Sequence, residues 1–427
     1  MTKILFVHSN FPAQFVHVAR ALARTRGVKL AAIGSHTARA IPGVRLLKYT
    51  VGDPNVAAAH PFARRFDLEC RRAEEVLYAA SSLASSGFVP DIIIGHPGWG
   101  ETLPLRSIFP KARIVTYCEM FYRSRGGDAD FDPEFPQTGI DGNVRIQLKN
   151  AATLLALAEC DTAISPTRWQ KSTYPGPYQD KIHVIHEGID VHAVKPAEDV
   201  SFRLPSGKCL TKADEVLTFG TRSFEPLRGY HIFMRALPRI LAARKQAQVL
   251  IIGGGGTPYG LAPPEGQTWR QIFFDEIAGQ VDAARIHFTG QLRYADYLRV
   301  LQISRAHVYL TYPFVLSWSL LEAMSSGCLI IASDTAPVRE VVNGRNGFLV
   351  PFFDVEALAQ QAIDALSGPR RFQSMRNRAR HTIVRRYDAK RTCVPKMLEF
   401  LGIEPTEDKP PETEMEPVLA MASRPAR

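Results

Sequence analysis

Short apolar runs separated by helix-length segments recur through almost the whole chain, and this alternation limits the fold more than any other feature. In the first half the predicted strands are KILFV, KLAAIG, VPDIIIG and ARIVTY, followed by strands within CDTAISPT and KIHVIHEGID. In the second half they are EVLTFG, AQVLIIG, RIHFTG, AHVYL, CLIIAS and GFLVP. Near-continuous apolar strands that alternate with helices are typical of parallel sheets covered on both faces. The sequence therefore predicts an α/β protein with two Rossmann-like, doubly wound parallel sheets that face a cleft.

Chain length and a break in the alternation predict where the two domains meet. A chain of 427 residues is too long for one hydrophobic core. The alternation stops in a polar stretch at residues 192–214 and restarts at Glu215. We expect a first domain over residues 1–195, a second over 196–385, a helix over 386–402 that crosses back to the first domain, and a disordered tail over 403–427 that is rich in Pro and Glu.

Composition narrows the class of protein. A hydrophobic content of 45% with 22% charged residues is that of a soluble globular protein. No apolar run is long enough to span a bilayer, and the start MTKILFVHSN reads as a buried strand, so we expect a cytoplasmic protein. The six cysteines are dispersed without a CxxC pair, which indicates reduced thiols and no cysteine metal site.

The net charge of +10 favours an anionic partner. A basic surface suits a phosphate-bearing ligand, an anionic membrane surface or nucleic acid. The arginines do not alternate with aromatic residues as in RNA-binding motifs, so we expect no nucleic acid partner.

The segment from Thr311 to Gly347 is the part of the chain most informative about ligand binding. Its pattern predicts a strand, a tight loop, a helix, a second strand and a glycine-rich turn. A helix that follows the carboxyl end of a strand is where an open α/β sheet binds a nucleotide. Glu322, one turn into that helix, is placed to bind ribose hydroxyls; the alternative is a solvent-facing glutamate. Its apolar neighbours, such as Leu321 and Met324, favour a functional role.

The second half resembles the retaining nucleotide-sugar glycosyltransferases of family 4 (group 1), which have the GT-B fold. The resemblance spans residues 215–390 in sequence and 1–400 in layout. The motif E-A-M-x-x-G and the glycine-rich turn after it are matched by Glu322, Ala323, Met324, Gly327, Glu340, Gly344, Gly347, Phe348 and Leu349.

The resemblance implies a metal-independent, hexosyltransferase-like enzyme without a cofactor, whose substrate is a nucleotide-diphosphate sugar. The first domain would be the acceptor side and the second the donor domain. The acceptor would be a glycan or a lipid-linked saccharide of a polysaccharide or envelope pathway. For a lipid-linked acceptor, the helix near residue 70, with four arginines, would contact the cytoplasmic face of an anionic membrane.

The resemblance also assigns the donor site. Negative charge that builds on the leaving diphosphate requires preorganised cations, and Arg222 and Arg228 stand where the family has such a pair, with Lys usual at the second position. The catalytic set expected is His96, Arg222, Arg228 and Glu322. The further donor-binding residues expected are Gly253, Gly290, Leu292, Phe314, Ser317 and Trp318.

Phe314 departs from the family pattern. The family has a sugar-contacting glutamate at this position, so the sugar needs another partner or the donor differs from the common hexoses. The run Gly253 to Gly256 is interpreted as a turn close to the nucleotide, because the prolines that follow it do not continue a dinucleotide fingerprint.

Acceptor-side candidates lie at strand ends of the first half. His8 ends the first strand, and Asn10 to Gln14 form the loop after it. His96 matches a family histidine near the reacting sugar, and a direct role and a structural role are equally open for it. The residues expected to line the acceptor pocket from the segment after ARIVTYC are Glu119, Tyr122 and Arg123.

Three alternatives stay open from the sequence. Asp128 and Asp130 form a DxD string, which holds a metal in another transferase fold, although an exposed acidic turn is favoured here. The same scaffold also serves sugar-nucleotide epimerases and phosphorylases. Phe314 raises a third alternative, a catalytically silent nucleotide-sugar-binding protein. The nucleobase, the sugar, the acceptor and the oligomeric state are not specified by the sequence.

Overall fold

The computed structural model describes residues 1–52, 55–136, 139–254, 259–404 and 419–420. The chain forms two compact units, the first made of Met1–Ser124, Gly139–Gly188 and Ala389–Arg427, and the second of Arg125–Thr138 and Ile189–Asp388. The sequence pattern placed the boundary at 195/196 and contained no signal that residues 125–138 join the second unit. Most of the tail expected over residues 403–427, and Gly255 and Gly256 of the glycine run, lie outside the described residues.

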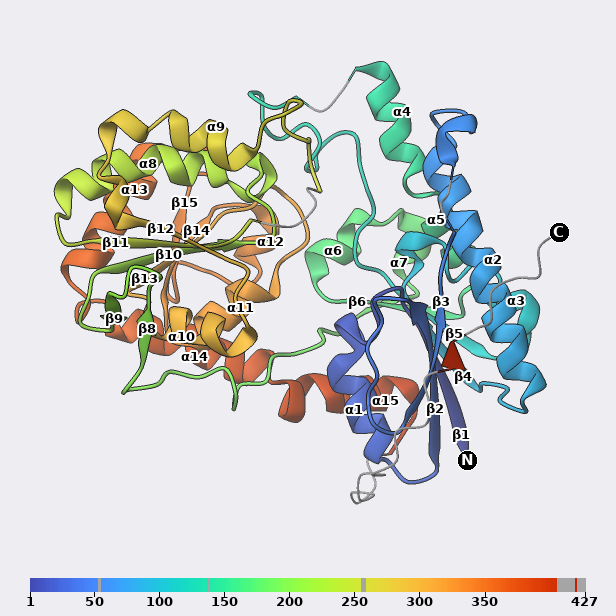
Figure 1. The fold of residues 1–427 in the computed structure, drawn as a ribbon. Helices are drawn as coiled ribbons and strands as arrows, with labels where there is room; N and C mark the ends of the chain where they lie inside the picture. The colour runs from blue at the N-terminus through green and yellow to red at the C-terminus, as the bar shows by residue number, and fades with distance from the viewer. Residues whose placement is uncertain (53–54, 137–138, 255–258, 405–418, 421–427) are drawn as a thin grey trace. The chain divides into compact units, whose positions relative to one another are not determined.

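The first unit is built on one parallel sheet with the strand order β16-β3-β2-β1-β4-β5-β6-β7 (Figure 1). Its strands are β1 (Thr2–Val7), β2 (Val28–Ser35), β3 (Val44–Tyr49), β4 (Ile92–Gly95), β5 (Arg113–Tyr117), β6 (Thr162–Ser165), β7 (Ile182–Val184) and β16 (Leu419–Ala420). Its α-helices are α1 (Val16–Arg24), α2 (Arg64–Ser85), α3 (Leu105–Ile108), α4 (Ile140–Leu148), α5 (Ala151–Glu159), α6 (Arg168–Thr173), α7 (Gly176–Gln179) and α15 (Val394–Leu401).

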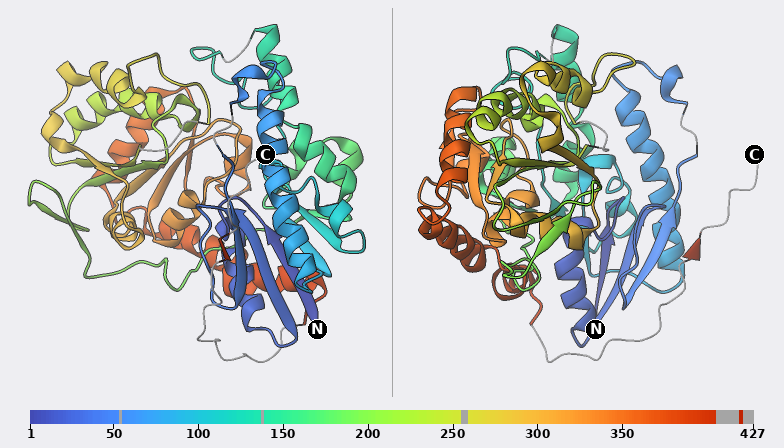
Figure 2. Two further views of the ribbon diagram at one scale, coloured as in Figure 1. Left: turned by 45° about the vertical axis from the view of Figure 1, so that its right-hand side comes forward. Right: turned by 60° about the vertical axis from the view of Figure 1, so that its left-hand side comes forward.

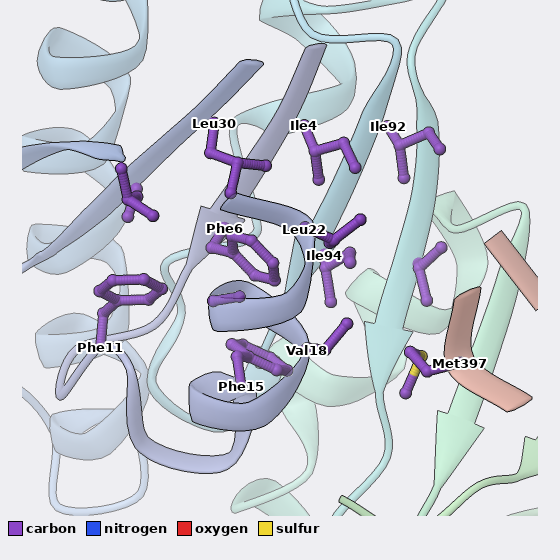
Figure 3. Close-up of a cluster of buried hydrophobic side chains, with 14 of the residues drawn as sticks. Ile4, Phe6, Phe11, Phe15, Val18, Leu22, Leu30, Ile92, Ile94 and Met397 are labelled. Atoms are coloured by element: carbon purple, nitrogen blue, oxygen red, sulfur yellow. The ribbon is translucent and has the colours of Figure 1, made fainter. Parts of the chain in front are cut away.

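Alternate residues of each strand supply the two cores of the first unit. Ile4 and Phe6 of β1 point to one face of the sheet, where they pack under α1 and α15 (Figure 3). Leu5 and Val7 point to the other face, which α2, α3 and α5 cover. Met397 of α15 belongs to the core under α1, so α15, near the end of the chain, packs on the first unit.

The second unit contains a parallel sheet with the order β12-β11-β10-β13-β14-β15. These strands are β10 (Val216–Thr221), β11 (Gln248–Gly253), β12 (Ile286–Gly290), β13 (Ala306–Tyr309), β14 (Leu329–Ser333) and β15 (Phe348–Val350). The strand order reverses beside β10, so the edge at β10 and β13 is the point where open α/β sheets bind ligands. A short antiparallel pair, β8 (Ser201–Arg203) and β9 (Cys209–Thr211), occupies the polar stretch before β10.

Helices cover both faces of this second sheet (Figure 2). They are α8 (Tyr230–Ala243), α9 (Trp269–Asp275), α10 (Tyr294–Ile303), α11 (Trp318–Ser325), α12 (Ala336–Arg339), α13 (Val355–Ser367) and α14 (Gln373–Arg386). One face is packed by α8 and α13, and the other by α10, α11 and α14. The prediction of two doubly wound parallel sheets is confirmed. None of the described helices combines the length and apolarity needed to cross a bilayer.

Candidate functional site

A pocket of about 370 Å³ lies at the carboxyl ends of β10, β11 and β13 in the second unit. Thr221 ends β10 and Gly253 ends β11, and both line this pocket. α11 begins on the far side of it with Trp318 and Ser319. A cavity of this size at the switch point of a parallel sheet is suited to a small polar ligand.

Glu322 lines the pocket from α11, and its carboxylate is held by two tyrosines of α10. The Tyr294 hydroxyl donates to Oε1 at 2.8 Å, and the Tyr297 hydroxyl donates to Oε2 at 3.0 Å. Burial raises the pKa of Glu322, while the two tyrosine hydrogen bonds act in the opposite direction. A carboxylate offers about four lone-pair positions, so two donors leave room for two hydroxyls of a ligand.

Arg222 and Arg228 line the same pocket from the loop after β10. The Arg228 Nη1 donates to Thr311 Oγ1 and to the Val315 carbonyl, both at 3.1 Å. The Arg222 Nη1 donates to the Tyr259 hydroxyl at 2.8 Å. These hydrogen-bond partners are neutral oxygens, and the Glu225 carboxylate in the same pocket interacts electrostatically with both arginines.

Glu225 is a pocket-lining residue that the sequence analysis did not identify. Its side chain is buried, and it accepts hydrogen bonds from the backbone N–H groups of Tyr259 at 3.0 Å and Gly260 at 2.7 Å. Burial raises the pKa of Glu225, and these backbone bonds oppose that rise. Glu225 therefore fixes the segment that carries Tyr259 beside Arg222. In the sequence, Glu225 could have been recognised as an acidic residue between Arg222 and Arg228 in the same loop.

Phe314 does not line the pocket. The ring is 4% exposed and lies beneath the Arg228 guanidinium, with 5.1 Å from the guanidinium carbon to the ring centroid. Its centroid is 5.7 Å from that of Tyr259. Thus an aromatic face supports Arg228 where the family has a carboxylate.

The other expected donor residues divide into two groups. Gly253, Ser317 and Trp318 line the pocket, and the Ser317 side chain also caps α11 by accepting from the Ser319 N–H. Gly290 and Leu292 lie at and after the end of β12, outside the pocket lining. Their contact with a donor stays a prediction.

His8, Gln14, His96 and Glu119 form one hydrogen-bonded network at the strand ends of the first unit. The Asn10 N–H donates to His8 Nδ1, so the His8 Nε2–H donates to the Gln14 carbonyl oxygen at 2.8 Å. The Gln14 amide donates to Glu119 Oε1 at 2.9 Å, and His96 Nε2 lies 3.3 Å from Glu119 Oε2.

Both histidine rings of this network are engaged through both nitrogens. His96 Nδ1 accepts from the Gly98 N–H at 3.1 Å, which leaves the Nε2–H to face Glu119. Burial and the neighbouring His96 lower the pKa of His8 to about 3, so His8 is neutral. Burial alone would raise the pKa of Glu119, but the bonds from His96 and Gln14 outweigh it and the net direction is downward.

Tyr122 and Arg123 lie beside this network rather than in it. The Arg123 guanidinium donates to the carbonyls of Thr173 at 2.9 Å and Ser172 at 2.6 Å, which are at the end of α6. The Tyr122 N–H donates to the Asn150 side chain at 2.9 Å. Their expected role at an acceptor pocket stays a prediction.

The DxD string is part of a turn. Asp130 accepts from the N–H groups of Gly126 at 2.9 Å and Gly127 at 3.3 Å, and Asp128 is buried. Among the described residues, one group of three metal-type side chains has its ligand atoms within 4.8 Å, namely Asp132, Glu134 and His231. Arg235 donates twice to Glu134 at 2.7 Å, so a guanidinium already supplies the positive charge there.

Each half of the chain matches a known protein family. Residues 26–194 match the family described as "Glycosyl transferase family 4 group", and residues 213–368 match "Glycosyl transferases group 1". The chain belongs to these glycosyltransferases, with a family 4 domain followed by a group 1 domain.

The curated relatives that the chain matches are named as mannosyltransferases. The chain is 28% identical over 203 residues to the GDP-mannose-dependent monoacylated alpha-(1-6)-phosphatidylinositol monomannoside mannosyltransferase of Corynebacterium glutamicum, covering 45% of this chain and 48% of the relative. It is 29% identical over 213 residues to the phosphatidyl-myo-inositol mannosyltransferase of Mycobacterium tuberculosis, covering 48% and 50%. The chain thus matches about half the length of these relatives.

Solved structures share the GT-B fold with this chain at low sequence identity. A sucrose-phosphate synthase from Thermosynechococcus elongatus aligns with a TM-score of 0.70 at 18% identity, over 94% of this chain and 98% of that one. Anabaena HepE in complex with UDP aligns with a TM-score of 0.63 at 16% identity, over 94% and 100%. The predicted fold class is confirmed by these likenesses.

Proposed function

We propose that this protein transfers a sugar from a nucleotide-diphosphate sugar to a glycan or lipid-linked acceptor, with retention of the anomeric configuration. The observation that carries the proposal is the pocket of the second unit, which combines a half-buried carboxylate, Glu322, with two arginines at a sheet switch point. A nucleoside diphosphate presents the matching groups, a ribose hydroxyl pair and an anionic diphosphate.

Each side chain then has a defined task. Glu322 accepts hydrogen bonds from the ribose hydroxyls, and its tyrosine partners hold the carboxylate for them. Arg222 and Arg228 bind the diphosphate. As the bond from the anomeric carbon to the phosphate oxygen breaks, negative charge grows on the leaving group, and the preorganised guanidinium pair stabilises it.

The acceptor proton does not require a protein base in this scheme. The acceptor oxygen bonds to the anomeric carbon while its proton passes to the departing phosphate oxygen. This is compatible with His96, whose two nitrogens are already engaged with Gly98 and Glu119. We assign Glu119, whose side chain is 30% exposed, to a hydrogen bond with a substrate hydroxyl, and His96 to holding that carboxylate in place.

The relatives suggest which substrates to test first. The Corynebacterium glutamicum relative is named for GDP-mannose, and the Mycobacterium tuberculosis relative for phosphatidyl-myo-inositol. HepE was solved with UDP and with UDP-glucose. We therefore propose GDP-mannose and UDP-glucose as first donors and phosphatidylinositol as first acceptor, with the arginine-bearing α2 contacting the cytoplasmic face of a membrane.

Turnover assays test the proposal. The protein would be incubated with GDP-mannose or UDP-glucose, with and without phosphatidylinositol vesicles or oligosaccharide acceptors, while nucleoside diphosphate release and glycosylated product are measured. We expect acceptor-dependent release that survives a chelator. Donor binding without transfer or hydrolysis in any arm would favour a silent binding protein. Turnover that depends on free phosphate, or that needs no acceptor, would favour a phosphorylase or an epimerase.

A further inference from the structure

Residues 125–136 lie in the first half of the sequence but pack as part of the second unit. Two phenylalanines of this segment enter aromatic clusters of that unit. The Phe131 ring lies 5.1 Å from Tyr312 and 5.3 Å from Phe352, measured between centroids. The Phe135 ring lies 5.4 Å from Trp269. We call residues 125–136 the inserted segment.

Two carboxylates fix the inserted segment between these rings. Asp132 is 3% exposed and accepts a hydrogen bond of 2.5 Å from the Tyr312 hydroxyl, while His231 Nε2 lies 3.2 Å from the same carboxylate oxygen. Glu134 receives two hydrogen bonds of 2.7 Å from Arg235. Burial opposes ionisation of Asp132, but the contacts from His231 and Tyr312 outweigh it and lower the pKa of this carboxyl.

Tyr312 connects this buried acid to the pocket. Its backbone N–H donates to the Leu227 carbonyl at 3.0 Å, one residue before Arg228. Thr311, the residue before Tyr312, and Val315, three residues after it, accept the two hydrogen bonds of the Arg228 guanidinium. The loop that holds Arg228 is therefore anchored at its centre by Asp132.

We infer that Asp132 is a positioning residue for the diphosphate end of the donor pocket, acting through the Tyr312 hydroxyl and the loop around it on Arg228. The inference rests on the proposed function, because it assumes that Arg228 binds a diphosphate. It gives the inserted segment a role: a stretch from the acceptor-side half of the sequence completes the donor-side site.

A metal at this cluster is the competing account of the same residues. A divalent ion on Asp132, Glu134 and His231 would have to displace the Arg235 guanidinium and the Tyr312 hydroxyl, which already satisfy the two carboxylates. The positioning role accounts for all of these contacts without that displacement.

Calorimetric titration of the full-length protein tests the inference, with GDP and UDP as probes and guanosine and uridine as diphosphate-free references. In Tyr312→Phe, which keeps the ring and removes only the hydroxyl, we expect affinity for the better diphosphate to fall about tenfold, because a hydrogen bond to a charged group is lost. Nucleoside affinity should stay unchanged. Asp132→Asn should act in the same direction.

Tyr49→Phe is the matched control, since Tyr49 also donates to a buried carboxylate, that of Glu101, but in the first unit. We expect it to leave diphosphate affinity unchanged. In an Arg228→Gln background, Tyr312→Phe should cause no further loss if the hydroxyl acts through Arg228.

The outcomes separate the inference from the function beneath it. A wild-type protein that binds neither GDP nor UDP overturns the proposed nucleotide site and the inference together. If the wild type binds a diphosphate and Tyr312→Phe binds it with the same affinity, only the inference is overturned. Equal losses for nucleoside and diphosphate, or additive losses with Arg228→Gln, overturn the route through Arg228. A divalent ion that binds the wild type and is lost in Asp132→Asn overturns it in favour of the metal account.

Discussion

Glu322 works as a ribose-binding group only if burial does not protonate it. Burial raises its pKa, and the hydroxyls of Tyr294 and Tyr297 oppose that rise by stabilising the charged form. The tyrosine pair therefore keeps the carboxylate both oriented and more readily ionised, which is what two ribose hydroxyl donors require.

Tyr297→Phe should shift the pH dependence of nucleotide binding. Loss of the hydrogen bond to Oε2 raises the pKa of Glu322 further. Because GDP affinity falls as this carboxylate protonates, the variant should lose affinity at a higher pH than the wild type. Calorimetry across a pH series measures the midpoint. Tyr78→Phe, which removes a tyrosine–glutamate bond in the first unit, is the control. An unshifted midpoint would contradict the role of the tyrosine.

The two arginines should contribute strongly to diphosphate affinity. Arg222→Gln combined with Arg228→Gln removes both charges from the pocket, and we expect a loss of roughly 2–5 kcal/mol in binding free energy for GDP or UDP. The guanosine or uridine affinity should change little. Wild-type diphosphate affinity and turnover in the double variant would remove both residues from the site.

His8 makes the first unit sensitive to acid. Its pKa is about 3 in the folded protein because of burial, against 6.5 when unfolded, so below 6.5 the unfolded chain binds a proton that the folded one excludes. Stability from this residue is present above pH 6.5 and falls as the pH drops toward 3. The difference in unfolding free energy between wild type and His8→Gln should change by up to about 1.4 kcal/mol per pH unit in that window. Denaturant titrations at several pH values measure it, and a pH-independent difference would refute it.

At the scale of elements, the pocket depends on how closely β10 and β11 approach at their carboxyl ends. Gly253 has a φ of +97°, and a Cβ there would lie 2.0 Å from the Thr221 carbonyl oxygen of β10. Only glycine allows this approach, which brings Thr221 and Gly253 together in the pocket wall.

Gly253→Ala should therefore lower both the stability of the protein and the affinity of the pocket for GDP. The strained backbone alone costs about 1–3 kcal/mol. Urea denaturation gives the stability, and GDP titration gives the affinity. Gly279→Ala is the matched control, because a Cβ at Gly279 meets no atom within 4 Å. If the two variants had the same stability and affinity, the close approach would not matter to the pocket.

Some elements could be read from the sequence and others could not. The six strands of the second sheet are continuous apolar runs between turn residues, so their positions were predictable. β3 was missed because Arg45 and Lys48 interrupt its apolar pattern, although it lies inside the first sheet. The arginine-bearing helix expected near residue 70 spans Arg64–Ser85 and begins after a turn at residues 61–63 that contains Pro61.

For the site, the sequence located groups that follow strand ends. Glu322, Arg222 and Arg228 come together because the carboxyl ends of neighbouring parallel strands share one edge of the sheet. Tyr294, Tyr297 and Glu225 were not foreseen, since their partners depend on side-chain packing between elements.

At the scale of the whole molecule, each of the two units is made of segments that are far apart in the sequence. The first unit takes its last helix from residues after 389, and the second takes the inserted segment from residues before 139. Each unit is therefore completed by a piece from the other half of the chain. The helix expected over residues 386–402 already crossed back to the first domain, whereas nothing in the strand pattern marked residues 125–136 as part of the second unit.

The measurement that tests the account most directly is the preference of the pocket for an intact ribose. GDP and UDP would be titrated calorimetrically against their 2′,3′-dideoxy forms, into wild type, Glu322→Ala and the surface control Glu356→Ala. We predict that wild type and Glu356→Ala prefer the ribonucleotide about tenfold or more, and that Glu322→Ala binds both forms equally. A Glu322→Ala protein that keeps the wild-type preference would contradict the assignment of Glu322 to the ribose, and with it the nucleotide site.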